Sequence, residues 1–184
     1  MPKAFKFNNP DGIYFVTFTA VDWIDIFTRP VYKEIIVDSL TYSIENKGLI
    51  VYAWVIMSNH MHMIISAQDN YKLSSIVRDF KKFTSKRIIE EVQTNPLESR
   101  KNWMLWLFKS HGEANSNNEN YQFWVQDYHG VELDNNKMME GRLNYTHNNP
   151  VKAQLVSEPE NYIFSSATDY TEGGKGLVEV VLLQ

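Results

Sequence analysis

The order of hydrophobic and polar positions along the chain predicts alternating strands and helices. Runs of β-branched and aromatic residues indicate strands, and apolar residues recurring three and four positions apart indicate helices. Pro30 suits the first turn of a helix, and Gly48 suits its C-terminal cap. The predicted elements are strands at 13–21, 49–57, 60–66 and 122–128, and helices at 30–47, 73–94 and 135–150, the last capped by Asp134 or Asn135 and ended by Pro150.

This order of strand, helix, strand, strand, helix and strand is the split βαβ pattern of ferredoxin-like and RRM-like folds. It predicts an α+β class with a central antiparallel sheet and helices on one face. The strands at 13–21 and 60–66 would be the central ones. Between the second long helix and the last strand, residues 103–108 indicate a short helix or a hydrophobic plug, and residues 111–120 a polar loop.

We expect a single domain over residues 1–184, with a core at about 10–156 and a C-terminal extension at about 157–184. The extension ends in an apolar run at 177–183 that predicts one more strand. Such a strand could add to its own sheet or cross to a second subunit.

Composition excludes several classes of protein. The 184 residues contain no cysteine, which rules out disulfides, cysteine zinc sites and thiol catalysis and fits a cytoplasmic location. The longest apolar run, at 49–57, is too short for a membrane span, and the first residues lack the apolar segment of a signal peptide. The net charge is −4. Binding to nucleic acid would therefore depend on a local basic patch.

Candidate chemistry begins with His60 and His62 in the predicted third strand. Side chains on a strand alternate between its faces, so these two imidazoles point the same way and could form half of a metal site. They could also be ordinary histidines. In the last predicted helix, Tyr145 and Asn149 are four residues apart and share one face. Asn149 could supply a third ligand through its amide oxygen, with Tyr145 beside it, although Tyr145 could equally be a packing residue.

A basic stripe lies on the polar face of the helix predicted at 73–94. Arg78, Lys82 and Lys86 are spaced by four and lie opposite the apolar stripe. They are either a solvated helix face or a set of contacts to DNA phosphates. Aromatic residues such as Trp103, Trp124 or Tyr128 could stack on exposed bases or belong to the core.

The motifs resemble those of the single-tyrosine HUH transposases of insertion sequences, and more closely the REP-associated tyrosine transposases. HUH denotes His-hydrophobe-His, which is His60-Met61-His62 in this chain. The resemblance extends over most of residues 10–170. It is carried by the segments Ser58–His62, Arg78–Thr84, Phe123–Trp124, Tyr145–Ala153 and Tyr162–Tyr170.

This resemblance implies roles for four residues. His60, His62 and Asn149 would bind a divalent metal, Mg²⁺ or Mn²⁺, and Tyr145 would be the nucleophile. The implied reaction cleaves single-stranded, hairpin-forming DNA, leaves a 5′-phosphotyrosine and a free 3′-hydroxyl, and rejoins strands without a nucleotide cofactor. The family also implies a homodimer that associates with the nucleoid when bound to DNA. Gln154 departs from the glycine usual at its position.

Two other functions stay open at this point. A non-catalytic DNA-binding regulator could use the same fold. A metal-dependent hydrolase of another class could combine His60 and His62 with His111, His129 or His147. Formation of a covalent protein–DNA adduct separates the first alternative from a transposase.

Overall fold

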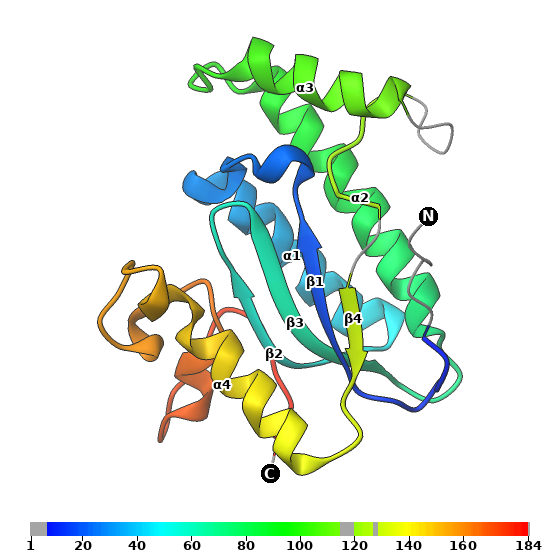
Figure 1. Ribbon diagram of the computed structural model, residues 1–184, viewed down its shortest axis with the longest axis vertical. Helices are drawn as coiled ribbons and strands as arrows, with labels where there is room; N and C mark the ends of the chain where they lie inside the picture. Colours follow the sequence, from blue (N-terminus) through cyan, green and yellow to red (C-terminus); the bar gives the residue numbers. More distant parts are fainter. Residues whose placement is uncertain (1–6, 115–119, 127–128, 184) are drawn as a thin grey trace.

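The computed structural model describes residues 7–114, 120–126 and 129–183, and its centre is a four-stranded antiparallel sheet (Figure 1). The strands are β1 (Tyr14–Thr19), β2 (Leu49–Ile56), β3 (His60–Ala67) and β4 (His129–Glu132), in the spatial order β2-β3-β1-β4. This arrangement confirms the predicted fold class and the central position of β1 and β3.

The helices cover both faces of the sheet (Figure 1). Helices α1 (Pro30–Lys47) and α2 (Leu73–Thr94) pack together on one face, and α4 (Asn136–Lys152) lies across the other. The predicted placement on one face therefore holds for α1 and α2 only. Helix α3 (Lys101–Glu113) packs on α2 beyond the end of the sheet, and it extends three residues into the predicted loop at 111–120.

Successive side chains of β3 point to opposite faces of the sheet, and the core accordingly has two parts. Met61 and Met63 point into the larger cluster, between the sheet and helices α1 and α2. Ile64, on the other face with the two histidines, packs with Phe15, Ala53 and Leu133 in a smaller cluster beneath α4. The period of two in the sequence therefore decides which residues of β3 support the fold and which face α4.

The ends of α1 and α4 follow the predicted signals, with one exception. Gly48 caps α1 in the left-handed conformation, with φ at 67°, and the Asn135 side chain accepts a hydrogen bond from the Met138 backbone N–H at the start of α4. Pro150 does not end α4, which continues to Lys152. A proline removes one N–H donor, and beyond it the backbone N–H of Ala153 still donates to the Asn149 carbonyl.

Two predicted strands are wrong. Residues 122–126 form no regular strand and make a single bridge, from Trp124 to Ala20, while the fourth strand lies further on, at His129–Glu132. Residues 127–128 lie outside the described residues. The aromatic pair that suggested a strand, Phe123 and Trp124, is buried on both sides of the chain and fills the core instead.

The C-terminal run at 177–183 is not a strand either. It lies beside β2, where the Val181 backbone N–H donates to the Val51 carbonyl. Nearer the C-terminal end of β2, the backbone of this edge strand is already hydrogen-bonded to residues 164–166 of the C-terminal extension. A fifth strand therefore cannot pair along the whole of β2. Among the described helices, none is long and apolar enough to cross a membrane.

Candidate active site on the sheet face beneath α4

The predicted site residues His60, His62 and Tyr145 lie together on the sheet face that α4 covers. The two imidazole rings are 4.8 Å apart between centroids, and the Tyr145 ring is 5.2 Å from that of His62. Phe15 of β1 lies beside them, stacked on His62 and in edge contact with Tyr145. Three segments far apart in the chain thus bring two imidazoles, a phenol and the Phe15 ring to one point.

The hydrogen bonds of His60 determine which of its ring nitrogens is free. Its Nδ1 is 2.7 Å from Oδ1 of Asn59, and Nδ2 of Asn59 donates to the Asp25 carboxylate. That second bond fixes the orientation of the amide, so the oxygen accepts and Nδ1 of His60 carries the proton. The lone pair of His60 is therefore on Nε2.

His62 is more deeply buried and has an unsatisfied atom. Its Nδ1 is 2.7 Å from the hydroxyl of Thr17, the residue directly opposite on β1. Its Nε2 is buried and has no hydrogen-bond partner among the described residues. Buried polar atoms nearly always have a partner, so this ring nitrogen, which lies beside a second imidazole, is available to a ligand.

Both histidines are held in the neutral form that binds metals. Burial lowers the pKa of His60. Burial, together with the neighbouring His60 ring and Arg142 guanidinium, lowers the pKa of His62 to about 3. Neutral imidazoles whose Nδ1 atoms are hydrogen-bonded and whose Nε2 atoms are free match the usual pattern of metal-binding histidines. The residues present therefore fit a divalent cation.

Within the described residues, the side chains that usually bind metals supply no third ligand beside the two histidines. No group of three His, Cys, Asp or Glu side chains that could hold a metal exists within the described ranges. Asn149 is half-buried on α4, one turn after Tyr145, and none of the described residues hydrogen-bonds its side-chain amide. Its role as a ligand stays a prediction. An amide oxygen with two imidazoles suits Mn²⁺ and is acceptable to Mg²⁺.

Two cations on α4 flank the tyrosine, and the sequence motifs did not single them out. The Arg142 guanidinium is 4.7 Å from the Phe15 ring centroid and 6.0 Å from that of Tyr145, and Nζ of Lys152 is 5.4 Å from the Tyr145 ring. Neither forms an ion pair with a carboxylate in the described structure. Their positions three residues before and seven after Tyr145 place them on its face of the helix, a spacing that could have identified them.

The other histidines do not join this site. Nε2 of His147 is 2.9 Å from Oγ of Ser166, which also accepts a hydrogen bond from the backbone N–H of Trp54 in β2. Burial lowers the pKa of His147 to about 4. His111 bonds Asp22, 2.9 Å away, and the side chain of His129 lies outside the described set. The observed contacts thus give no support to a hydrolase built on His111 or His147.

The predicted basic stripe lies on the far side of the sheet from the histidines. Arg78, Lys82 and Lys86 are exposed on α2; Arg78 pairs with Asp79 at 2.8 Å and Lys86 with Glu90 at 3.8 Å. A contact of this stripe with DNA stays a prediction, and it would involve DNA remote from the tyrosine.

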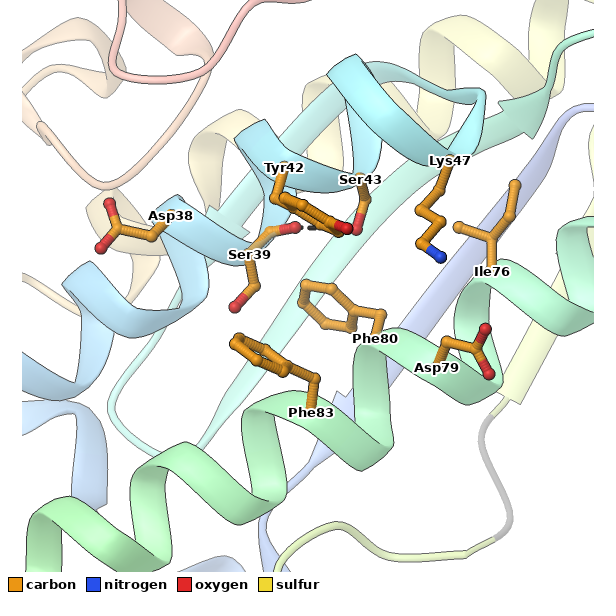
Figure 2. Close-up of a pocket in the computed structure, with 9 residues that line it drawn as sticks. All are labelled: Asp38, Ser39, Tyr42, Ser43, Lys47, Ile76, Asp79, Phe80 and Phe83. Atoms are coloured by element: carbon orange, nitrogen blue, oxygen red, sulfur yellow. Dashed lines mark hydrogen bonds between the residues drawn. The ribbon is translucent and has the colours of Figure 1, made fainter.

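A cavity of about 520 Å³ lies between α1 and α2 on that same far side. Figure 2 shows the aromatic side chains of Tyr42, Phe80 and Phe83 around it, with Asp38 and Asp79 at opposite sides of the view. Neither a histidine nor the nucleophile candidate lines it, so it is separate from the candidate active site.

Comparison with known proteins decides the family. The family model described as "Transposase IS200 like" matches residues 14–106, half of the chain. The chain belongs to the IS200-like transposase family. This match includes β1, with Phe15 and Thr17, and the histidine pair of β3, but ends before α4. Among curated proteins, no sequence matches this transposase.

Solved structures support the fold of this transposase. A REP-associated tyrosine transposase bound to a REP hairpin is 17% identical, with a TM-score of 0.65, over 98% of this chain and 92% of that one. A putative transposase from Deinococcus radiodurans R1 is 14% identical over 79% and 96% of the two chains, with a TM-score of 0.48. A tRNA(His) guanylyltransferase from Saccharomyces cerevisiae is 11% identical over 82% and 63%, at 0.49. At 17% identity the first resemblance concerns the fold alone, and the last two are too distant to carry an argument.

Proposed function

We propose that this DNA transposase cleaves single-stranded DNA with Tyr145 as the nucleophile, beside a divalent cation bound by His60, His62 and Asn149. The observation that carries the proposal is the contact between the Tyr145 ring and the ring of His62, whose buried Nε2 lacks a partner. The hairpin held by the distant structural relative favours a DNA hairpin as the substrate here too.

In the proposed reaction, the Tyr145 oxygen attacks a backbone phosphorus. The phenol of Tyr145 gives up its proton as its oxygen bonds to the 5′-phosphate. The phosphorus–oxygen bond that breaks releases the 3′-oxygen, which takes up a proton and becomes a 3′-hydroxyl. A bound divalent cation would polarise the phosphate. Because the phosphotyrosine bond replaces a phosphodiester of similar energy, a second 3′-hydroxyl can attack it and rejoin the strands without a nucleotide cofactor.

The residues of the chain supply position and charge. Phe15 and His62 contact the Tyr145 ring and restrict it to the space beside the histidines. Arg142 and Lys152 bring two positive charges to the same place, where they would contact non-bridging phosphate oxygens. The tyrosine and the histidines that it would serve belong to one chain in this arrangement.

The test is formation of a covalent adduct. The purified protein is incubated with Mn²⁺ and a labelled pool of single-stranded DNA hairpins with randomised flanking sequence, and adducts that survive denaturing electrophoresis are counted. We expect wild type to form adducts and Tyr145→Phe to form none. Tyr42→Phe is the matched control, because Tyr42 is an exposed tyrosine on α1, on the other side of the sheet.

An adduct with Tyr145→Phe would exclude Tyr145 as the nucleophile. Adduct formation at full yield in the presence of a chelator would exclude the metal. Tight binding of the hairpins by wild type without any adduct, over all flanking sequences, would favour the non-catalytic regulator.

A further inference from the structure

Trp23 is an exposed tryptophan next to the candidate active site. Its side chain is 64% exposed, and its ring centroid is 6.0 Å from that of His60, in an edge-to-face arrangement. The other apolar residues of this segment, Val21, Ile24 and Ile26, are all buried. Trp23 is therefore the one large apolar side chain here that the fold leaves outside the core.

The backbone that presents Trp23 is unfavourable for this residue type. Asp22 and Trp23 have φ angles of 51° and 55°, in the left-handed region that side chains with a Cβ rarely adopt. For a bulky residue such as tryptophan this conformation is an outlier. Strained positions that persist cluster at functional sites, because the surrounding structure must be built to hold them.

The surrounding contacts hold this strained segment against the histidine strand. The Asp22 carboxylate bonds Nε2 of His111 on α3 at 2.9 Å. On the other side, the Asp25 carboxylate accepts from Asn59, the same amide that accepts from Nδ1 of His60. One hydrogen-bond network thus positions both His60 and the segment that carries Trp23.

We propose that Trp23 is a stacking platform for an unpaired base of the DNA strand next to the phosphate that is cut. This inference rests on the proposed function, since it takes the histidine pair as the centre of cleavage. Tryptophan offers a flat apolar face, and stacking of bases on aromatic side chains is a general means of binding single-stranded nucleic acid. It would orient the strand so that the phosphate lies between the histidines and Tyr145.

The proposal is tested by equilibrium binding, without cleavage. All variants are made in the Tyr145→Phe protein, and affinity for the single-stranded hairpin substrate is measured by fluorescence anisotropy. We expect Trp23→Ala to weaken binding by about 5-fold to about 150-fold, the range for the loss of one stacked base, and Trp23→Phe to recover part of the loss. Trp106→Ala, which removes an equally exposed indole from α3, is the matched control.

A scan with single abasic nucleotides locates the base. In protein with Trp23, one position beside the cut should weaken binding when its base is absent. In Trp23→Ala, that same substitution should have no further effect. Equal losses for Trp23→Ala and Trp106→Ala, or an abasic effect that persists undiminished in Trp23→Ala, would overturn the proposal.

Folding is checked separately, with the melting temperature of each variant. Trp23→Gly removes the indole and the strained φ together, so it should lose the same affinity as Trp23→Ala without a lower melting temperature. Affinity close to that of the Trp23 protein in this variant would also overturn the proposal. Because these measurements record binding and not cleavage, their outcome is independent of whether Tyr145 is the nucleophile.

Discussion

Two buried polar groups, Glu98 and His62, differ in how they are satisfied. Both are almost inaccessible, at 4% and 5% exposure. The Glu98 carboxylate accepts from the Tyr32 hydroxyl at 3.0 Å, from Arg29 at 3.0 Å, and from the backbone and side chain of Arg100. His62 has one partner, Thr17, and an Nε2 without any among the described residues.

This is the difference expected between a polar group that stabilises the fold and one that is kept available for a ligand. A carboxylate whose oxygens are satisfied ties α1 to the start of α3 and leaves no capacity for a ligand. An imidazole that keeps one nitrogen unpaired in a buried place leaves that capacity open at a cost in stability. Replacing Glu98 should therefore damage the fold, whereas replacing His62 should damage the reaction.

The largest expected effect is that of His62→Phe on cleavage. The phenyl ring keeps the contacts with Phe15 and Tyr145 but removes the nitrogen that would bind the cation. We expect adduct formation to slow by at least about 1000-fold, because a bound cation contributes several kcal/mol to such reactions. The rate is measured with the selected hairpin under single-turnover conditions.

The stability of His62→Phe should be close to that of wild type, because the substitution also removes an unsatisfied polar atom. Met61→Ala is the opposite control on the same strand: it should lose about 2–5 kcal/mol of stability and still cleave while folded. If the His62→Phe protein cleaves normally, His62 is not needed for the reaction, and its contrast with Glu98 does not hold.

The next effect is that of Glu98→Gln on the free energy of unfolding. The substitution leaves Arg29 and Arg100 without their anion, and we expect a loss of about 3 kcal/mol, the lower end for a broken buried pair, since both arginines are about one-third exposed. Urea denaturation measures it. Glu90→Gln, which breaks only exposed pairs with Lys86 and Arg87, should change stability by less than about 1 kcal/mol.

A smaller effect is expected for Thr17→Val. The valine keeps the shape of the side chain but cannot bond Nδ1 of His62, so the ring loses the contact that orients it. Removing such a supporting hydrogen bond typically weakens metal affinity or activity by about 10-fold to 100-fold. Titration of Mn²⁺, followed by the rise in melting temperature, measures affinity apart from cleavage. An unchanged titration would show that the ring needs no support from β1.

The smallest effect is the pH dependence of the stability that Glu98 contributes through its bonds with Tyr32, Arg29 and Arg100. Burial raises the pKa of Glu98, but hydrogen bonds from Arg100 and Tyr32 outweigh it, so the pKa lies below its ordinary value of 4.5. A carboxylate with a lowered pKa stabilises the fold above 4.5, and this contribution is lost as the pH falls through the folded pKa. The stability gap between wild type and Glu98→Gln should therefore narrow in acid; a constant gap would contradict the ionic role of Glu98.

Local rules predicted the features of the fold and the site that depend on nearby residues. The period of two put His60 and His62 on one face of β3, and the spacing of four put Tyr145 and Asn149 on one side of α4. Thr17 could not be predicted in the same way. It meets His62 only through the register of β1 against β3, which depends on the whole sheet.

The errors occurred where tertiary contacts overrode local preference. Phe123 and Trp124 have the composition of a strand. In the structure both rings pack against Phe27 in the core, so this segment does not form a regular strand of the sheet. Pro150 fell within α4 because the backbone N–H groups after it still find carbonyl partners. Trp23 was not identified because its significance depends on the backbone angle and on the nearby His60.

The anchoring of α4 has a consequence for the order of events in strand transfer. Two residues after Tyr145, His147 is bonded through Ser166 to the edge strand β2, and swinging the helix outward would break this buried pair. On the proposed function, a DNA end attached to Tyr145 would therefore stay beside the histidines. The incoming strand has to reach that fixed end, so exchange would proceed by rearranging nucleic acid over a stationary protein surface.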